Sequence, residues 1–233
     1  MEPAEKQEHI IPRCMGIIMD GNRRWARAHG KLPFDGHAAG YEKMKDMLGW
    51  AREAGISHII LYAFSSENWN RAPEEVSYLM KLLKRACVDE VAHFKKENAR
   101  IRVIGDRSRF SKDITDAIEN AEEQTKNCTG ETLVLAVSYS GRDELVEAAR
   151  KLCGKTPAEI TKETFAKELW TDGIPDPDLI IRTSGEQRLS GFLLWQAAYS
   201  ELFFTKTLWP DFTRDEFEKA LAFFASTKRN FGV

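Results

Sequence analysis

Short apolar runs alternate with amphipathic helices along the chain, and this alternation constrains the fold more than any other feature of the sequence. The runs Ile59–Leu61 and Leu133–Val137 are apolar at every position, as strands covered on both faces should be. After Pro73, apolar residues recur at helical spacing from Val76 to Phe94. Strands that alternate with such helices predict an α/β fold with a mostly parallel central sheet.

We expect a single domain over residues 1–233, with residues 1–12 as an N-terminal segment. Its sheet should have about six strands, covered by helices on both faces. Five strands can be placed from the apolar runs: Cys14–Met19, His58–Phe64, Arg100–Gly105, Thr132–Ser138 and Leu179–Arg182. Helices are expected at about residues 22–29, 37–54, 73–96, 112–127, 143–153, 162–169 and 214–226.

The charges of the chain nearly balance, since 34 Lys and Arg against 36 Asp and Glu give a formal net charge of −2. A general nucleic-acid-binding protein normally has a basic excess, so we expect no nucleic-acid partner. The four cysteines are far apart and form no Cys-x-x-Cys pair, which predicts free thiols in a reducing compartment.

Nothing in the chain predicts secretion or a membrane span. The segment Met1–Arg13 lacks the apolar region of a signal peptide. No apolar run approaches the roughly 18 residues that a spanning helix needs. We therefore expect a cytoplasmic protein, with at most peripheral contact at the inner face of the membrane.

The first strand ends in a segment, Asp20–Trp25, that suggests a phosphate site. In parallel sheets ligands bind beyond the carboxyl ends of the strands. Gly21 permits a tight turn, and Arg23 and Arg24 supply positive charge for a phosphate. Asp20 would repel a phosphate unless a divalent cation, most plausibly Mg²⁺, lies between them. The plainer alternative is that Asp20 caps a helix and the arginines are solvated. Neither a Walker A loop nor a Gly-x-Gly-x-x-Gly motif is present, so a nucleotide is not the expected ligand.

Polar and aromatic residues follow the second strand, from Tyr62 to Arg71. Ser65, Glu67 and Asn68 can hydrogen-bond a reacting centre, and Trp69 can cover an apolar chain. The alternative is an ordinary turn that uses the hydrogen bonding of Ser and Asn.

The strand Leu179–Arg182 leads into a glycine turn with two cationic side chains and a hydroxyl. Arg182, Arg188 and Ser190 suit a pyrophosphate, because arginine offers a fork of donors. The alternative is surface ion pairing with Glu186.

The three clusters can face one cleft, because each lies at the end of a predicted strand. Two arginine-bearing anion sites and one carboxylate describe a site for two phosphorylated substrates and one Mg²⁺. The chain also has 13 Phe, 6 Trp and 6 Met, which could be plain core or could line a hydrophobic tunnel.

At these residues the sequence resembles the cis-prenyltransferase family, the undecaprenyl-diphosphate synthases and their relatives. The matching stretches are His9–Pro12, Asp20–Trp25, Gly36-His37, Tyr62–Arg71, Ile104–Asp106, Ile181–Ser190, Phe192–Gln196 on to Glu201, and Trp209–Asp211. The Asp-Asp-x-x-Asp motif of the trans-type prenyltransferases is absent from the sequence.

The resemblance implies a magnesium-dependent homodimer that condenses isopentenyl diphosphate onto an allylic diphosphate, usually farnesyl diphosphate. The product implied is a long-chain cis-polyprenyl diphosphate such as undecaprenyl diphosphate, a lipid carrier for cell-wall synthesis, released through transient contact with a membrane surface. A short-chain synthase, a non-catalytic partner subunit of the same fold and a phosphate-ester hydrolase are the alternatives.

The resemblance also assigns residues. It makes Asp20 and Asn68 catalytic, and it makes Asp20 and Glu201 the Mg²⁺ ligands. The substrate-binding residues it implies are Gly21, Asn22, Arg23, Arg24, Trp25, His37, Ser65, Ser66, Glu67, Trp69, Arg71, Arg182, Arg188, Leu189 and Ser190.

Three positions depart from the family pattern. Pro33 stands where an arginine is usual, and Gly191 stands where an asparagine is common. Near the C-terminus, Asn230 replaces the arginine of a common Arg-Phe-Gly sequence. We expect these changes to alter affinity rather than abolish activity, and Pro33 to make allylic-diphosphate binding depend more on Arg23 and Arg24.

Overall fold

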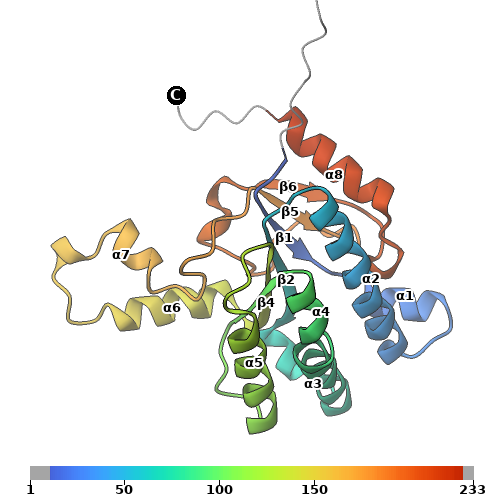
Figure 1. Ribbon diagram of the computed structural model, residues 1–233, viewed down its shortest axis with the longest axis horizontal. Coiled ribbons are helices and arrows are strands. Elements are labelled where there is room, and N and C mark those ends of the chain that lie inside the picture. Colours follow the sequence, from blue (N-terminus) through green and yellow to red (C-terminus); the bar gives the residue numbers. More distant parts are fainter. Residues whose placement is uncertain (1–10, 228–233) are drawn as a thin grey trace, which may run out of the picture.

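A six-stranded sheet forms the centre of the computed structural model, which describes residues 11–227 (Figure 1). All neighbouring strands are parallel, in the order β3-β4-β2-β1-β5-β6. The strands are β1 (Cys14–Ile18), β2 (His58–Ser65), β3 (Arg100–Ile104), β4 (Thr132–Tyr139), β5 (Leu179–Arg182) and β6 (Glu201–Phe204). The predicted parallel α/β fold is confirmed.

The helices fall between the strands, as the sequence predicts. The α-helices are α1 (Asn22–Ala28), α2 (Pro33–Glu53), α3 (Pro73–Val88), α4 (Val91–Lys96), α5 (Lys112–Thr125), α6 (Gly141–Lys151), α7 (Lys162–Ala166) and α8 (Arg214–Ser226). Short 3-10 helices are η1 (Ser66–Asn70), η2 (Pro157–Glu159), η3 (Gln196–Tyr199) and η4 (Trp209–Asp211).

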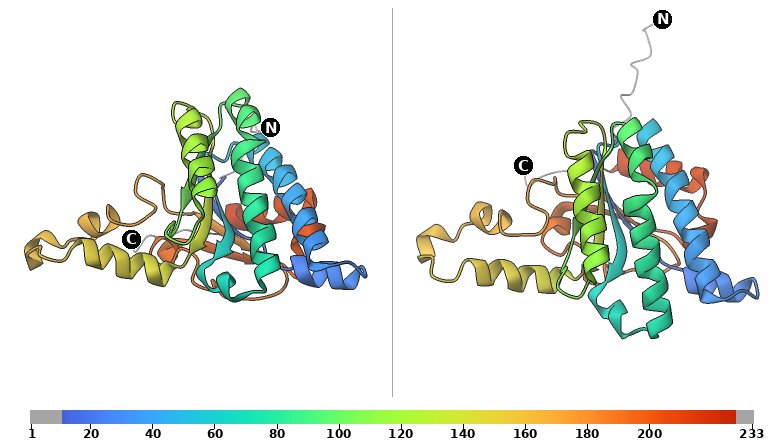
Figure 2. Two further views of the ribbon diagram at one scale, coloured as in Figure 1. Left: turned by 90° about the horizontal axis from the view of Figure 1, so that it is seen from below. Right: turned by 60° about the horizontal axis from the view of Figure 1, so that its bottom comes forward.

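Alternate residues of the strands face opposite sides of the sheet and form two cores. Ile59 and Leu61 belong to the larger core, against which α2 to α5 and α8 pack. Figure 2 shows α2, α3 and α5 side by side on this face. Ile60 points the other way, into a smaller core that includes Phe192 and Leu193 from the segment after β5.

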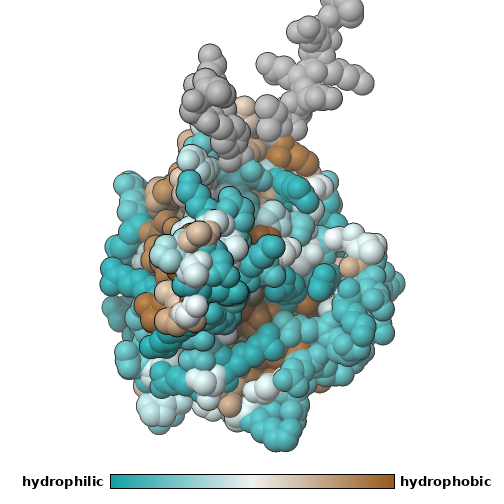
Figure 3. All heavy atoms as spheres, turned by 90° about the vertical axis from the view of Figure 1, so that its left-hand side faces the viewer, coloured by the Kyte–Doolittle hydropathy of each residue, from teal (hydrophilic) through white to brown (hydrophobic). Residues whose placement is uncertain are grey.

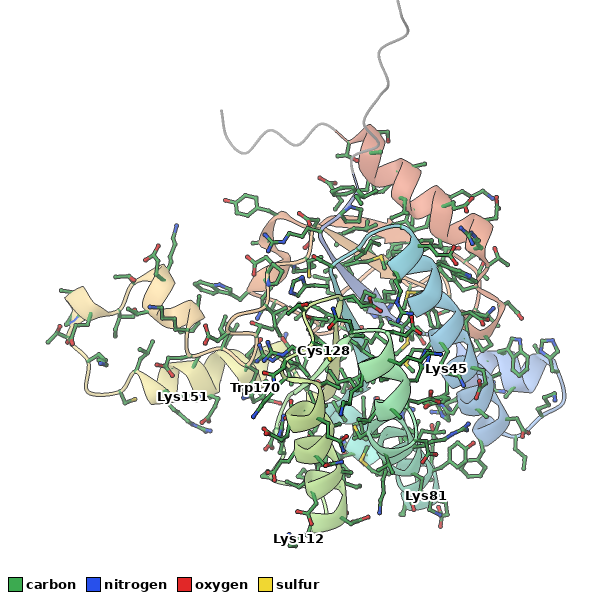
Figure 4. The ribbon with its side chains drawn as sticks, in the orientation of Figure 1. Lys45, Lys81, Lys112, Cys128, Lys151 and Trp170 are labelled. Atoms are coloured by element: carbon green, nitrogen blue, oxygen red, sulfur yellow. The ribbon has the colours of Figure 1, made fainter. Side chains whose placement is uncertain are left out.

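An arm, residues 141–178, carries α6 and α7 away from the body of the molecule (Figure 1). It returns to the body at Trp170 (Figure 4), whose ring lies 5.7 Å from that of Tyr139. Beneath it, the buried Glu144 of α6 accepts a 2.6 Å hydrogen bond from the Tyr139 hydroxyl. This hydrogen bond and the one that the same Oε2 accepts from Gln196 at 3.1 Å connect the root of the arm to the body, whereas Glu144 Oε1 has no partner among the described residues.

Two predictions of the local structure were wrong. The single helix expected at 73–96 is two helices, because the chain turns at Asp89 and Glu90, and Glu90 accepts a hydrogen bond from the Tyr41 hydroxyl of α2. The apolar spacing continues across this turn because Val91 and Phe94 still face the core. The helix expected from residue 37 begins at Pro33, where a proline suits the first turn.

The crossing of α1 and α2 depends on two glycines. A Cβ at Gly36 would lie 2.1 Å from the backbone oxygen of Asn22, and one at Gly40 would lie 2.4 Å from the Asn22 side-chain oxygen. The carbonyl of Gly40 accepts a 2.8 Å hydrogen bond from the buried Trp209 indole. The missing side chains therefore let α1 lie directly on α2, which fixes the segment that follows β1.

Among residues 11–227, no helix is long and apolar enough to cross a membrane.

We predict that Gly36→Ala lowers the free energy of unfolding by about 1–3 kcal/mol, because the new methyl group meets backbone that cannot move aside without separating the helices. Urea unfolding followed by circular dichroism measures the change. Gly49→Ala is the matched control in the same helix, since nothing lies within 4 Å of its Cβ position. Alanine there should raise stability by about 0.5–1 kcal/mol, and a Gly36→Ala protein as stable as Gly49→Ala would contradict the close-crossing explanation.

Candidate active site

A cavity of about 920 Å³ opens where the carboxyl ends of the strands meet. Residues after β1, β2, β4 and β5 line it, among them Asp20, Asn68, Ser140 and Arg182. Six of the lining residues are arginines and only Asp20 and Glu67 are acidic. The three clusters predicted to share a cleft do so, and the excess of positive charge favours an anionic ligand.

Asp20 lies at the centre of a charged cluster. Its Oδ2 is 3.0 Å from Arg182 Nη2 and 3.5 Å from Arg24 Nη2, and its Oδ1 accepts a 2.8 Å hydrogen bond from the Gly21 amide. Arg182 is only 4% exposed and also donates to Ser190 Oγ at 2.8 Å. The carboxylate therefore neutralises a buried guanidinium, and a ligand phosphate bound beside Asp20 lies within reach of both arginines.

Arg24 connects the first cluster to the third. Its guanidinium donates to the Ser184 carbonyl at 3.1 Å and to the Ser184 hydroxyl, and it lies 3.6 Å from Glu186. The arginine is therefore held across the turn that follows β5, not free in solvent.

A second buried network joins α2 to α3. Glu75 accepts a 3.0 Å hydrogen bond from His37 Nε2 and a 2.9 Å bond from Arg71. Burial lowers the pKa of His37 below its ordinary value, so the ring is neutral near pH 7. Burial favours a higher pKa for the Glu75 carboxyl, but the His37 hydrogen bond and the charges of Arg71 and Arg23 outweigh it and lower the pKa. Ionised Glu75 thus positions His37 and Arg71, which both line the cavity.

Of the side chains that follow β2, Asn68 lines the cavity and Trp69 does not. Asn68 accepts a 3.2 Å hydrogen bond from the Ser65 amide through its side-chain oxygen, so its side-chain N–H groups are not used in that bond. Trp69 instead packs on Phe64 and donates its indole N–H to Ser138 at 2.9 Å. Its ring is held by protein rather than exposed for a substrate.

Most of the predicted site residues line the cavity. Those that do are Asp20, Gly21, Asn22, Arg23, Arg24, His37, Ser65, Glu67, Asn68, Arg71, Arg182 and Ser190. Those outside the lining are Trp25, Ser66, Trp69, Arg188, Leu189 and Glu201.

The residues outside the lining have protein partners of their own. Trp25 donates its indole N–H to Asp211 at 2.7 Å, and Ser66 donates to Asp143 at 3.0 Å. Arg188 is an exposed side chain that pairs with Glu186. These contacts hold the side chains outside the cavity. The local sequence does not reveal such contacts, so it could not separate these residues from those that line the cavity.

Glu201 lies at the wrong end of the sheet to share a metal with Asp20 in the same chain. It is the first residue of β6 and is in register with Leu179, which is itself in register with Met15. Asp20 follows Ile18, the last residue of β1. Parallel strands rise about 3.3 Å per residue, so roughly 10 Å separate the level of Glu201 from Ile18 alone. Within one chain the two carboxylates are therefore too far apart to bind the same ion, and the metal-binding role of Glu201 stays a prediction.

Asp20 alone still fits Mg²⁺. In residues 11–227 no group of three or more His, Cys, Asp or Glu side chains could hold a metal ion. Mg²⁺ usually keeps several waters and binds through one or two carboxylates together with substrate phosphates. One partly exposed carboxylate among arginines matches that donor set, provided that the substrate supplies phosphate oxygens.

Several lining residues were not predicted. Arg27 and Arg142 add charge, and Tyr62 donates its hydroxyl to the Ser190 carbonyl at 3.2 Å. The interior is apolar and is lined by Tyr41, Met44, Phe64, Leu79, Met80, Leu82, Leu83, Ala86, Leu135 and Val137. Arg142 follows a buried strand directly, so the rule that pointed to the other three strand ends could have found it.

Comparison with known proteins gives one consistent result. The family described as putative undecaprenyl diphosphate synthase matches residues 18–232. An isoprenyl transferase of Rhizobium meliloti is 52% identical over 228 residues, which cover 95% of this chain and 92% of that protein. One of Porphyromonas gingivalis is 44% identical over 229 residues, covering 96% and 90%.

Solved structures agree with these relatives. A lavandulyl diphosphate synthase from Lavandula x intermedia, in complex with dimethylallyl diphosphate, is 36% identical with a TM-score of 0.92 and covers 96% of this chain and 99% of its own. A probable undecaprenyl diphosphate synthase from Campylobacter jejuni is 35% identical with a TM-score of 0.80, covering 95% and 99%.

We predict that Glu75→Gln lowers the free energy of unfolding by about 1–3 kcal/mol at pH 7, because the buried His37 and the partly buried Arg71 lose their charged partner. Chemical denaturation of Glu75→Gln beside Glu74→Gln, the exposed neighbour on α3, isolates the effect. The pKa of Glu75 is lower in the folded state than in the unfolded state, so its charge stabilises the fold above the unfolded pKa. The difference between wild type and Glu75→Gln should therefore shrink as the pH falls through the folded pKa. Equal stability of both variants at pH 7 would refute the role of this network.

Proposed function

The chain belongs to the undecaprenyl diphosphate synthase family of isoprenyl transferases, and from that premise we propose that it elongates an allylic diphosphate with isopentenyl diphosphate units. Farnesyl diphosphate is the proposed acceptor, and Mg²⁺ the proposed cofactor. The proposed product is a long-chain cis-polyprenyl diphosphate such as undecaprenyl diphosphate, a lipid carrier for cell-wall synthesis.

One observation carries this proposal: a single cavity joins an arginine-rich mouth to an apolar interior. A polyprenyl diphosphate has the same division, with a highly charged head group and a hydrocarbon tail. Arginine binds phosphates through a fork of donors, and apolar walls favour the hydrocarbon because contact with water is lost. Met44, Leu83 and Ala86, from α2 and α3, are the kind of wall along which a growing chain could extend.

Asp20 would hold Mg²⁺ against the allylic diphosphate, and the ion would supply Lewis-acid stabilisation of the departing group. The chain's own residues do the rest. Arg24 and Arg182 already lie within 3.5 Å of Asp20. They would stabilise the negative charge that develops on the diphosphate when the allylic carbon–oxygen bond breaks.

The double bond of isopentenyl diphosphate then attacks the allylic carbon, and the new carbon–carbon bond is followed by loss of a proton. Orientation of the two chains in the cavity sets the cis geometry. An amide is a poor base, so Asn68 orients the proton rather than keeping it, and the departed diphosphate is its acceptor. The proposed holders of the second diphosphate are Arg71, Arg182 and Ser190, which line the cavity, and Arg188, which would have to leave its exposed pairing with Glu186.

Assembly as a homodimer and contact with a membrane are further parts of the proposal. β6 is an edge strand; its own Leu202 is 37% exposed, and Tyr199, two residues before the strand, is 75% exposed. Unpaired edges and exposed apolar side chains favour association with a partner surface. Figure 3, seen from the side of the arm, shows apolar patches among hydrophilic side chains. Such patches suit transient contact at the cytoplasmic face of a membrane, where an apolar product would leave.

A short-chain cis-prenyl diphosphate synthase is the second candidate. It is favoured by the close likeness to the lavandulyl diphosphate synthase, whose structure holds the short allylic substrate dimethylallyl diphosphate. The two candidates differ in the number of additions and not in the chemistry at Asp20.

The deciding experiment incubates the purified protein with farnesyl diphosphate, labelled isopentenyl diphosphate and Mg²⁺, and sizes the labelled lipid. Long products support the proposal, and a product that stops after one addition supports the short-chain candidate. Absence of any label in lipid would contradict both and would leave a non-catalytic partner subunit as the better account. Chelation of Mg²⁺ should stop incorporation.

We predict that Asp20→Ala reduces turnover by about 100-fold or more, because the centre of the charged mouth is removed. Asp20→Asn keeps the hydrogen bond from Gly21 and should fail similarly, which separates the loss of charge from a change in shape. Circular dichroism checks that both variants fold. Asp89→Ala, at an exposed carboxylate on the far end of α3, should keep full activity. Turnover of folded Asp20→Asn within a few-fold of wild type would contradict the metal-binding role.

A further inference from the structure

The end of β4 also faces the cavity, in addition to the strand ends that carry the predicted clusters. β4 ends at Tyr139, Ser140 is the N-cap residue of α6, and Gly141 is the first residue of that helix. Ser140 and Arg142 line the cavity together with Ser190. The amino end of an eleven-residue helix therefore opens on the space where a diphosphate is proposed to bind.

The start of α6 is held against the segment that carries Ser190. The Gly141 amide donates a 2.7 Å hydrogen bond to the Gly191 carbonyl, and a Cβ at Gly141 would lie only 2.7 Å from the same oxygen. The Tyr62 hydroxyl donates to the Ser190 carbonyl from the other side, at 3.2 Å. This backbone contact fixes where the side chain of Arg142 begins relative to Ser190.

The side chain of Arg142 has no hydrogen bond or ion pair with any residue in the range 11–227. The neighbouring carboxylate does not pair with it, because Asp143 accepts from Ser66 Oγ. Three other arginines of the cavity pair with carboxylates, Arg24 and Arg182 with Asp20 and Arg71 with Glu75, whereas the side chains of Arg23 and Arg27 resemble Arg142 in having no ion pair among the described residues. A guanidinium without a protein partner keeps all its donors available for a ligand.

Two further groups of the cavity lining have no hydrogen-bond partner among the described residues. Ser140 is 4% exposed and occupies the N-cap position of α6, but its side chain does not cap the helix. The buried Nε of Arg182 has no hydrogen-bond partner among the described residues. Buried polar groups are nearly always hydrogen-bonded, so the unpaired Nε of Arg182 in the wall of the cavity points to a ligand contact there. The positive end of the α6 dipole and the guanidinium of Arg142 favour an anion as that ligand.

We propose that the amino end of α6 is part of a diphosphate-binding site, in which Arg142 and Ser140 contact the diphosphate of isopentenyl diphosphate beside Ser190. The identity of the ligand rests on the function proposed above, whereas the binding of a diphosphate rests on the geometry alone. Arg142 is a substrate-binding residue in this account, and it acts on the second substrate rather than on the allylic one.

The test compares Arg142→Ala with Arg142→Lys and Arg150→Ala. Arg150 lies two turns further along α6, is 73% exposed and pairs with Glu147, so it is a matched control outside the cavity. Arg142→Ala should raise KM for isopentenyl diphosphate about tenfold or more, as expected for the loss of a charge-assisted contact. KM for farnesyl diphosphate should stay unchanged. The KM of Arg142→Lys for isopentenyl diphosphate should lie between those of wild type and Arg142→Ala. The KM of Arg150→Ala should match that of wild type.

Calorimetric titration with inorganic pyrophosphate measures diphosphate binding independently of the reaction. Arg142→Ala should weaken its binding while Arg150→Ala does not, even if the wild-type protein shows no incorporation of isopentenyl units. Weaker pyrophosphate binding by Arg142→Ala together with no incorporation by wild type would contradict the proposed function but support the diphosphate site. Unchanged pyrophosphate affinity and unchanged KM in a folded Arg142→Ala protein would overturn the inference. A rise in KM confined to farnesyl diphosphate would overturn its assignment to the second substrate.

Discussion

The ion pair between Asp20 and Arg182 is the contact on which the site depends. It joins the carboxyl ends of two neighbouring strands, because Ile18 of β1 is in register with Arg182 of β5. Arg182 is almost fully buried, and a buried guanidinium without a charged partner would be strongly destabilising. The backbone oxygen of Asp20 also accepts from the Trp209 amide and the Thr183 hydroxyl. Asp20 therefore connects the sheet, the η4 segment and the arginines of the cavity.

The fold supplies the two halves of the cavity by different means. The charged half comes from strand ends, which a parallel sheet gathers at one edge, and from α1, which glycines in α2 allow to lie close. The apolar half comes from α2 and α3, whose inward faces pack on the larger core and also line the cavity. Glu75 of α3 accepts hydrogen bonds from Arg71 and from the neutral His37, and so positions both of these cavity-lining side chains. A head group and a hydrocarbon tail can thus be bound by one continuous surface.

Much of this arrangement is predictable from sequence, and the failures have physical reasons. The gathering of Asp20, Arg24 and Arg182 follows from apolar runs that end in polar residues, because parallel strands share an edge. β6 is too short, and its side chains too exposed, for its pattern to be recognised, so the level of Glu201 in the sheet could not be foreseen. Trp69 carries no local signal that separates a substrate contact from packing on Phe64. The predictions for Asn230 fall outside the described residues.

The central claim is that one cavity both binds the diphosphates and receives the growing chain, and the lengths of the products test it most directly. Ala86 of α3 is buried and lines the apolar interior, whereas Val88 on the same helix is 51% exposed. The account predicts that Ala86→Phe shortens the labelled polyprenyl products, because the added ring occupies space that the chain needs, and that Val88→Phe leaves their lengths unchanged. Identical product lengths from a folded, active Ala86→Phe enzyme and from wild type would contradict the account.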